Sequence, residues 1–495
     1  MVISNKPKVN QKLIVPAIII LILALATVVF YFGGPFLAKK DNGYRGPAAK
    51  LNGVTVRDQD FNQNMYQVMQ EANNVASEMP TIGEILDRAL VLSIKDLMLR
   101  QGIQKAGSQV IVSNTVLDQY LKRRWPTAEE MEAAMQQHGT RNKGLFKKII
   151  RSNLEILRFY LYQGRQLKMT VSKEEVLERL ERITTRHILI SVLDPQTYQP
   201  IRSPGEAFQR AMEVYQKVTE RPEGDNFGQL ATQYSDDPDT KEQGGTPGAL
   251  PLDRFKQTRA EEYVKKALAL KPGEISKPVK VVILKPNEDG YPTPTIIGYY
   301  IIQFISREMP KGADYQLQYQ EAADDLLLQK TQEPNSPYIV WEQENLKKAL
   351  NQMEVIDPFL KGYRLLQAGQ WAEAAPAFEK AMLKKYYQDQ RETYLYAAKA
   401  YSNMKQIPKA INVLEKAQKK FKDMVDYQVA LAKLYKENQQ PDLAAKTLAN
   451  LSANHMAIAS EAQIHETIKN IYAEWQMPEA AAKEAEIIAA LKKKE

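Results

Sequence analysis

Two apolar stretches, TRHILISV at 185–192 and GYYIIQFI at 298–305, decide how the middle of this chain folds. Branched and aromatic side chains dominate both stretches, which is typical of β-strands. Between them, alanines and valines recur at helical spacing across 207–218, and the residues PNEDG at 286–290 predict a turn in a hairpin-like insertion. We therefore expect residues 171–308 to form one domain, with strands at its ends and helices between them.

Length and composition limit the possible functions. The chain has 495 residues, so three or four domains are expected. Its net charge is +8, but the 67 basic residues are interleaved with 59 acidic ones along the chain, which disfavours a nucleic-acid partner. The absence of cysteine excludes thiol catalysis, disulfides and cysteine-based zinc sites. No pair of the four histidines has helix-spaced ligand geometry, so neither a metal nor a cofactor is expected.

A long uncharged segment lies near the start of the chain. Residues 13–32 read LIVPAIIILILALATVVFYF, and at about 1.5 Å per residue they span a hydrocarbon core of roughly 30 Å. The aromatic residues at its end suit a membrane interface. We predict a single-pass anchor with the short N-terminal tail inside and the bulk of the chain outside the cytoplasm. A cleaved signal peptide is the alternative.

The region between this segment and the β-rich domain is expected to be helical. A linker is predicted over 38–50, followed by a helical domain over 51–170. An apolar stripe at helical spacing runs through 85–98, and Ser113 predicts the start of a further helix. A helical connector is expected over 309–356, after the β-rich domain.

The remaining residues, 357–495, contain an internal repeat. The alanine-led trio Ala374–Phe378–Ala381 recurs as Ala410–Leu414–Ala417 and Ala444–Leu448–Leu451. The spacings of 36 and 34 residues are typical of a tetratricopeptide (TPR) array of paired helices. Twelve residues before each trio the side chain is small, which lets paired helices approach closely; these positions are Gly362, Ala398 and Ala432. An alanine-rich helical bundle is the alternative.

The β-rich domain resembles the parvulin family of peptidyl-prolyl isomerases. The resemblance rests on an ordered series of motifs over about 120 residues: RHIL at 186–189, FGQLATQYSDDP at 227–238, GGTPG at 244–248, LKPGEISKPV at 270–279 and GYYII at 298–302. The region before it resembles the N-terminal chaperone domain of the SurA and PrsA foldases, through LNGV at 51–54, ILDRAL at 85–90 and VSKEEV at 171–176. The predicted fold class is thus multidomain α+β: a membrane helix, a SurA-like helical domain, a parvulin domain and an all-α repeat array. For the parvulin domain the resemblance implies an antiparallel sheet with surrounding helices.

The resemblance implies a site for twisting X–Pro bonds. His187 and Asp237 are expected on its polar side, with Tyr300 where the family usually has a second histidine. Substrate-binding positions implied in the same way are Ser235, Phe255, Tyr263 and Leu268. We expect the Tyr300 hydroxyl to be able to hydrogen-bond His187. Pro247 is a second departure from the family pattern, because it stiffens a turn that usually reads GGDLG.

Two functions follow from these patterns. In the first, an isomerase-chaperone in the cytoplasmic (inner) membrane of a bacterium holds unfolded or nascent exported polypeptides and isomerises their prolines. In the second, a catalytically inactive chaperone or scaffold binds clients, while the repeat array docks a protein partner. The SurA and PrsA resemblance also makes a homodimer a possibility. A protease or hydrolase is disfavoured, because the sequence shows no paired nucleophile and base and no phosphate-binding loop.

Overall fold

The computed structural model describes residues 46–75, 80–197, 199–220, 225–286, 292–453 and 461–493. The predicted membrane segment, residues 13–32, lies outside them. Within these ranges, no helix combines the length and the apolar character that crossing a bilayer requires. The described residues divide into two compact units, 157–340 and the remainder on either side of it. Each unit is described by itself.

The unit formed by residues 157–340 contains a four-stranded antiparallel sheet. Its strand order is β4-β3-β6-β5, with β3 (Arg182–Ser191) and β6 (Pro292–Glu308) at the centre and β4 (Ala249–Pro251) and β5 (Val279–Pro286) at the edges. The two central strands contain the two stretches predicted to be β-strands, and β5 pairs with β6 as the predicted hairpin insertion. The sequence prediction of an antiparallel sheet is confirmed.

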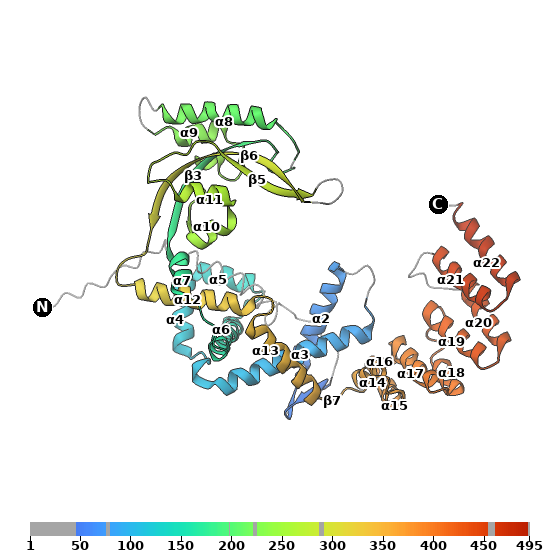
Figure 1. Cartoon of the computed structure of the whole chain (residues 1–495). Coiled ribbons are helices and arrows are strands. Elements are labelled where there is room, and N and C mark those ends of the chain that lie inside the picture. The colour runs from blue at the N-terminus through green and yellow to red at the C-terminus, as the bar shows by residue number, and fades with distance from the viewer. Residues whose placement is uncertain are drawn as a thin grey trace. The chain divides into compact units, whose positions relative to one another are not determined.

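Helices cover both faces of this sheet (Figure 1). One face packs against α8 (Pro204–Thr219) and α9 (Phe227–Tyr234), and the other against α10 (Leu252–Thr258) and α11 (Glu261–Leu268). Side chains alternate between the faces of a strand, so β3 sends Ile188 and Ile190 to the first layer and Ile183 to the second. The alanines and valines that recur at helical spacing across 207–218 lie in the first of these two cores.

Two further helices flank the sheet domain, α7 (Lys173–Leu180) and α12 (Tyr315–Gln332). Ser172 caps α7 in a capping box with Glu175, which fixes where the helix begins. Arg179, whose side chain is 7% exposed, joins α7 to its neighbours through Asp253 and Asp325. This buried arginine ties the sheet domain to α12.

The second unit begins with a small sheet of distant strands. β1 (Ala49–Leu51) pairs with β2 (Val54–Thr55) through a tight turn, and on its other edge with β7 (Glu354–Val355). Among the described residues before 157, the helices are α2 (Asp58–Val75), α3 (Ile82–Ala106), α4 (Asn114–Arg124), α5 (Ala128–Gln137) and most of α6 (Lys143–Gln166). The predicted cap Ser113 does start α4. Each unit also contains a short 3-10 turn: η2 (Gly107–Gln109) lies in the second unit, and η3 (Lys241–Gln243) lies in the unit formed by residues 157–340.

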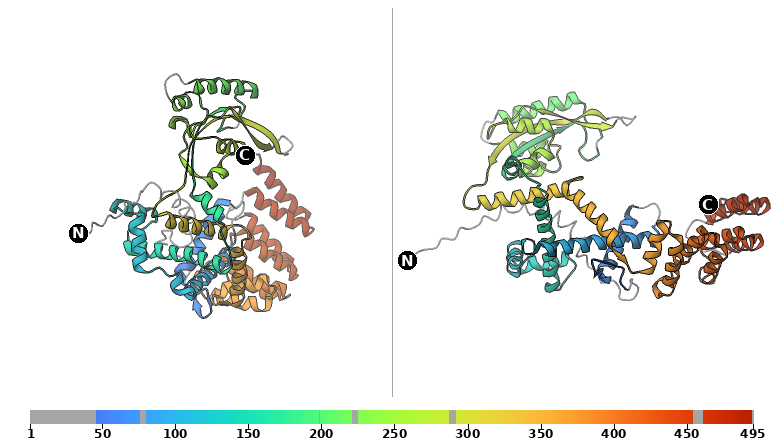
Figure 2. Two further views of the ribbon diagram at one scale, coloured as in Figure 1. Left: turned by 60° about the vertical axis from the view of Figure 1, so that its left-hand side comes forward. Right: turned by 60° about the horizontal axis from the view of Figure 1, so that its bottom comes forward.

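After most of α13 (Pro337–Gln352), the chain continues as successive helices, each packed on the next (Figure 2). They are α14 (Pro358–Gln367), α15 (Trp371–Met382), α16 (Lys385–Gln388), α17 (Arg391–Asn403), α18 (Ile407–Glu415), α19 (Val425–Glu437), α20 (Pro441–Ala453), α21 (Glu461–Glu474) and α22 (Pro478–Leu491). A Cβ on Gly362 would lie 3.0 Å from the Phe378 ring, so the small residue does permit close packing there.

One hydrophobic core in the second unit is shared by residues from both ends of the sequence. It contains Leu51, Phe61 and Leu86 from the early segments, together with Phe359 and Phe378 from the late ones. The sequence analysis predicted separate domains over 51–170 and 357–495. Those boundaries remain predictions, and the shared core shows that the two ranges pack together.

Candidate active site

The pairing of β3 with β6 places the two predicted polar residues on one face of the sheet. His187 lies opposite Ile302, and Tyr300 lies opposite Leu189. Positions two apart on paired strands point to the same side, so both rings lie on the face covered by α10 and α11. The ring centroids of His187 and Tyr300 are 5.1 Å apart, edge to face.

His187 is buried and hydrogen-bonded at both ring nitrogens. Its Nε2 lies 2.6 Å from Oδ2 of Asp237, and its Nδ1 lies 3.2 Å from the hydroxyl oxygen of Tyr263. Thr240 donates its hydroxyl to the same Asp237 oxygen at 2.7 Å. The backbone N–H of Asp239 donates to Oδ1 of Asp237 at 3.1 Å. Asp237 thus accepts several hydrogen bonds at one end of this network, and its side chain is 13% exposed.

Burial and hydrogen bonding set the charges in this network. Desolvation lowers the pKa of His187, and the hydrogen bond to Asp237 only partly opposes this effect. Burial alone would raise the pKa of Asp237, but the hydrogen bonds from His187 and Thr240 outweigh it and lower that pKa to about 2. At neutral pH the pair is therefore a neutral imidazole that donates from Nε2 to an ionised carboxylate.

Hydrogen bonds of the neighbouring residues Ser235 and Asp236 position the turn after α9, which carries Asp237. Ser235 ends α9, and its hydroxyl accepts hydrogen bonds from the backbone N–H groups of Leu189 and Asp237. Ser235 is 1% exposed, so its position suits holding the turn against β3. Asp236 accepts hydrogen bonds from Arg202 and points away from the histidine. Of the two adjacent aspartates, only Asp237 reaches His187.

The GGTPG segment is held directly against the histidine backbone. His187 donates its N–H to the carbonyl of Gly245 at 2.9 Å. Gly245 has a φ of 80°, and a Cβ there would lie 2.3 Å from the carbonyl oxygen of His187. No other residue could occupy this position without moving β3 or the turn. The glycine pair therefore sets the distance between the turn and the histidine strand.

Aromatic residues form the wall behind the polar groups. Tyr263 and Phe255 are each 1% exposed, and their ring centroids lie 6.0 Å apart. Leu268 is partly buried in the same cluster. Tyr300 contacts both His187 and Tyr263 edge-on, at 5.1 and 5.3 Å. Six of the seven predicted side chains thus gather around one sheet face, and Ser235 supports the turn beside it.

The sequence allowed a hydrogen bond between Tyr300 and His187, but the structure places a different hydroxyl beside the ring. The hydroxyl beside Nδ1 belongs to Tyr263, which comes from α11 and not from β6. Tyr300 meets the imidazole through its ring. The strand register accounts for this difference. Tyr300 lies diagonally opposite His187 on the neighbouring strand, so the two rings pack edge to face, whereas α11, which covers this face, brings the Tyr263 hydroxyl to the ring.

Two threonines of the network were missing from the predicted site. Thr240 bridges to Asp237, and its Oγ1 also lies 3.3 Å from Nε2 of His187. Thr185 lies 3.2 Å from the Tyr263 hydroxyl. A threonine three residues after the aspartate, in an acidic turn, is a sequence signal that could have indicated Thr240. Thr185 carries no such signal beyond its place on the histidine strand.

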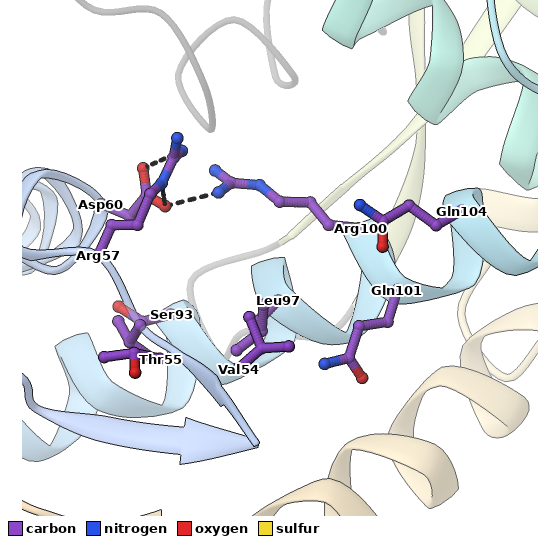
Figure 3. Close-up of a pocket in the computed structure, with 10 residues that line it drawn as sticks. Val54, Thr55, Arg57, Asp60, Ser93, Leu97, Arg100, Gln101 and Gln104 are labelled. Atoms are coloured by element: carbon purple, nitrogen blue, oxygen red, sulfur yellow. Dashed lines mark hydrogen bonds and ion pairs between the residues drawn. The ribbon is translucent and has the colours of Figure 1, made fainter. Parts of the chain in front are cut away.

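The helical unit contains two adjoining cavities beside α2 and α3. The smaller, of about 260 Å³, holds a carboxylate between two guanidinium groups: Arg57 and Arg100 both donate to Asp60 (Figure 3). The larger, of about 460 Å³, extends to α6 and combines apolar side chains such as Leu99 and Ile149 with charged ones. Such mixed cavities suit peptide segments that carry both apolar and polar groups.

Comparison with known proteins places the histidine network in a known family of domains. Residues 187–304 match the family described as Rotamase, PPIC-type PPIASE domain. The chain is 26% identical to Foldase protein PrsA 3 of Bacillus anthracis over 239 residues, which cover 47% of this chain and 70% of that protein. It is 30% identical to Foldase protein PrsA of Caldanaerobacter subterraneus subsp. tengcongensis over 159 residues, covering 31% of this chain and 45% of that one.

A solved structure of PrsA from Bacillus anthracis is also similar, at 22% identity. The alignment covers 52% of this chain and 96% of the other, with a TM-score of 0.23, which is too low to carry over its arrangement. The assignment therefore rests on the family match and the sequence relatives. Together they show that the chain carries a parvulin-type peptidyl-prolyl cis–trans isomerase domain, with residues 187–304 as its matched core.

Proposed function

We propose that this chain is a membrane-anchored, extracytoplasmic foldase that isomerises X–Pro bonds in exported polypeptides. The observation that carries the proposal is the His187–Asp237 pair, fixed by hydrogen bonds within a PPIC-type domain. Two relatives bear the name Foldase protein PrsA, which favours the same role. The predicted span over residues 13–32 would provide the anchor.

The geometry suits a reaction that breaks no covalent bond. Rotation about an X–Pro bond is slow because the bond has partial double-bond character, so a catalyst must bind the twisted imide better than either planar form. An ionised Asp237 beside the substrate carbonyl would disfavour the conjugated form, in which that oxygen carries negative charge. Tyr300, the partly exposed aromatic of the site, would offer its ring to the proline.

The helical unit would supply the chaperone function. The cavity between α2, α3 and α6 combines apolar walls with cationic and acidic groups, which suits unfolded segments of varied sequence. The helices from α14 onward pack in succession, each on the next, which supports assigning them to the TPR class. Such an array would bind a protein partner, with no nucleic acid, metal or cofactor involved.

A binding-only parvulin domain is the second candidate. It is favoured by Tyr300 in place of the second histidine and by Pro247 in the glycine turn. In that case the domain would bind prolyl peptides without accelerating their isomerisation.

The two candidates differ in the behaviour of His187→Ala. With a prolyl peptide as substrate, we expect the full-length chain to accelerate isomerisation and the variant to lose at least tenfold in kcat/KM. His138→Ala, far from the network in sequence, should stay within twofold. A wild-type rate equal to that of buffer, with prevention of aggregation retained, would establish the binding-only function instead.

The same assay has an expected pH dependence. Burial lowers the pKa of His187 below its ordinary value of 6.5, so the neutral ring is fully present above pH 6.5. Activity should therefore be constant at neutral and mildly alkaline pH and decrease as pH falls through the lowered pKa. The contribution of His187 to stability should begin to fall near pH 6.5, where the unfolded ring takes up a proton, and level off below the lowered folded-state pKa. Activity that instead rises on acidification would contradict a neutral histidine.

The proposed location has its own test. A reporter enzyme that works only outside the cytoplasm, fused after Glu495, should be active. A fusion that works only in the cytoplasm would overturn the orientation and leave the isomerase proposal intact.

A further inference from the structure

Tyr263 occupies an unusual position for a residue expected to line a proline pocket. It comes from α11, its side chain is buried, and its hydroxyl points at the sheet (Figure 1 shows α11 on one side of the sheet). The hydroxyl oxygen lies 3.2 Å from Nδ1 of His187 and 3.2 Å from Oγ1 of Thr185. These contacts tie a helix residue and a second strand residue to the imidazole.

The hydrogen-bond directions in this chain follow from the charges. Asp237 is ionised and can only accept, so the imidazole proton lies on Nε2, which faces it. Nδ1 is then an acceptor, and its donor is the Tyr263 hydroxyl. Burial raises the pKa of Tyr263 to about 12, so the phenol keeps its proton at neutral pH. Thr185 then donates to the Tyr263 oxygen, which completes this series of hydrogen bonds.

The surroundings hold the tyrosine ring in this orientation. Tyr300 packs edge-on against it at 90°, and Phe255 packs against its other side. The Arg259 guanidinium lies 5.7 Å from the ring centroid, as in a cation–π contact. The charged groups near the hydroxyl are thus Arg259 and Asp237, and neither donates to Nδ1.

We propose that Tyr263, supported by Thr185, is a positioning residue that fixes the tautomer and orientation of His187. The inference rests on the proposed role of His187 and Asp237 in isomerisation. Without the phenol, Nδ1 would be a buried acceptor with no donor, and the proton could move between the two ring nitrogens. The Nε2–H bond that holds Asp237 would then be weakened. In this chain the donor comes from α11, since β6 carries a tyrosine ring where the family usually has a histidine.

The test removes single oxygen atoms. In the full-length chain, Tyr263→Phe should lower kcat on a prolyl peptide by about 5- to 30-fold, with KM changed less than twofold, as expected for one lost hydrogen bond. Thr185→Val should lower it by a smaller factor, and Thr185→Ser should restore it. Tyr299→Phe is the matched control, because Tyr299 faces the opposite layer, against Phe208. Its kcat should equal that of the wild type.

A spectroscopic readout separates positioning from packing. The chain has four histidines, so the side-chain ¹⁵N resonances of a ¹⁵N-histidine sample can be assigned by single substitutions. His187 should show a protonated Nε2 in the wild type and in Tyr299→Phe, and a mixed or shifted pattern in Tyr263→Phe.

The possible outcomes are distinct. An unchanged His187 spectrum in Tyr263→Phe overturns the inference, whether kcat is unchanged or KM alone rises. The latter result would make Tyr263 a substrate-pocket residue only. If His187→Ala itself leaves activity unchanged, the proposed function fails, whereas a loss there combined with a silent Tyr263→Phe removes only this inference.

Discussion

Asp96 illustrates what a single buried carboxylate does to the helical unit. It lies on α3 and is 3% exposed, and Asn64 donates to its Oδ2 at 3.0 Å. Its Oδ1 has no hydrogen-bond partner among the residues that the structure describes. Burial raises its pKa to about 7, although the hydrogen bond from Asn64 and the charge of Arg100 oppose the shift. Because the folded-state pKa exceeds the unfolded value, stability from this group falls as pH rises from about 4 to about 7.

Asp96→Asn should therefore stabilise the protein only at higher pH. The amide can still accept from Asn64, and it no longer places a negative charge in a buried site. We expect a gain on the order of 2 kcal/mol at pH 8 and little change at pH 4, measured as the unfolding transition of the helical unit. Glu344→Gln, an exposed neutralisation on α13, serves as the control. An equal gain at both pH values would show that the charge of Asp96 is not responsible.

The site residues show which features of a site can be predicted from the sequence. The ordered motifs identified His187 and Asp237, because their neighbours in the chain carry the pattern. They gave no indication of the Tyr263–His187 hydrogen bond, since 76 residues separate the two and the contact depends on how α11 lies on the sheet. A motif consists of residues that are close together in the chain, whereas hydrogen-bond partners on a buried face can be far apart in the chain.

Between elements, a buried arginine on α7, Arg179, connects that helix to its neighbours. Arg179 donates to Asp253 at 2.6 Å and to Gln329 at 2.8 Å, and it forms an ion pair with Asp325 on α12. Burial raises the pKa of Asp325 to about 6, while the charge of Arg179 opposes that shift. Removing the arginine would leave a buried carboxylate without its counter-charge.

We expect Arg179→Met to lower the free energy of unfolding of this unit by about 3 kcal/mol. The loss should be larger at pH 8 than at pH 5, since Asp325 is ionised at the higher pH, and adding Asp325→Asn should recover part of it. Arg307→Met removes an exposed partner of Glu181 and should cost less than about 1 kcal/mol. Thermal or urea unfolding of the wild type and the three variants measures the differences, and equal losses in the two single arginine variants would contradict the buried-charge argument.

Elements themselves were largely predictable. Runs of branched and aromatic residues predicted β3 and β6, helical spacing predicted α8, and the 34- and 36-residue repeat predicted the C-terminal helices. The short edge strand β4 was not anticipated, because its three residues are too few for a period and it exists only by pairing with β3.

For the molecule as a whole, the helical unit is assembled from both ends of the sequence. Ala49 in β1 pairs with Val355 in β7. Gly83 on α3 faces the ring of Tyr363 on α14 so closely that a Cβ would lie 2.4 Å from it. Arg364 also donates to Asp87 at 2.9 Å. The early helices thus bury their apolar faces against segments that follow the isomerase domain in the chain.

A chain that ends at Val340 should therefore lose part of its fold. We expect the backbone amides of α3 to lose protection from hydrogen exchange, since β7 and α14 are gone, while those of β3 and β6 remain protected and isomerase activity persists. A chain that ends at Ala453 keeps both contacts and should retain protection of α3. Protection of α3 that is the same in the Val340 chain and the full-length chain would show that the early helices fold without their C-terminal partners.

The sequence by itself determined the parvulin-like order of strands and helices, the positions of His187 and Asp237, and the repeat period of the C-terminal helices. All of these depend on residues close together in the chain, where side-chain periodicity reports burial directly. Only the tertiary structure decided which hydroxyl meets Nδ1 of His187, and that β1 pairs with a strand some 300 residues later. Such contacts join surfaces with no shared local pattern, so they become visible only when the elements are packed.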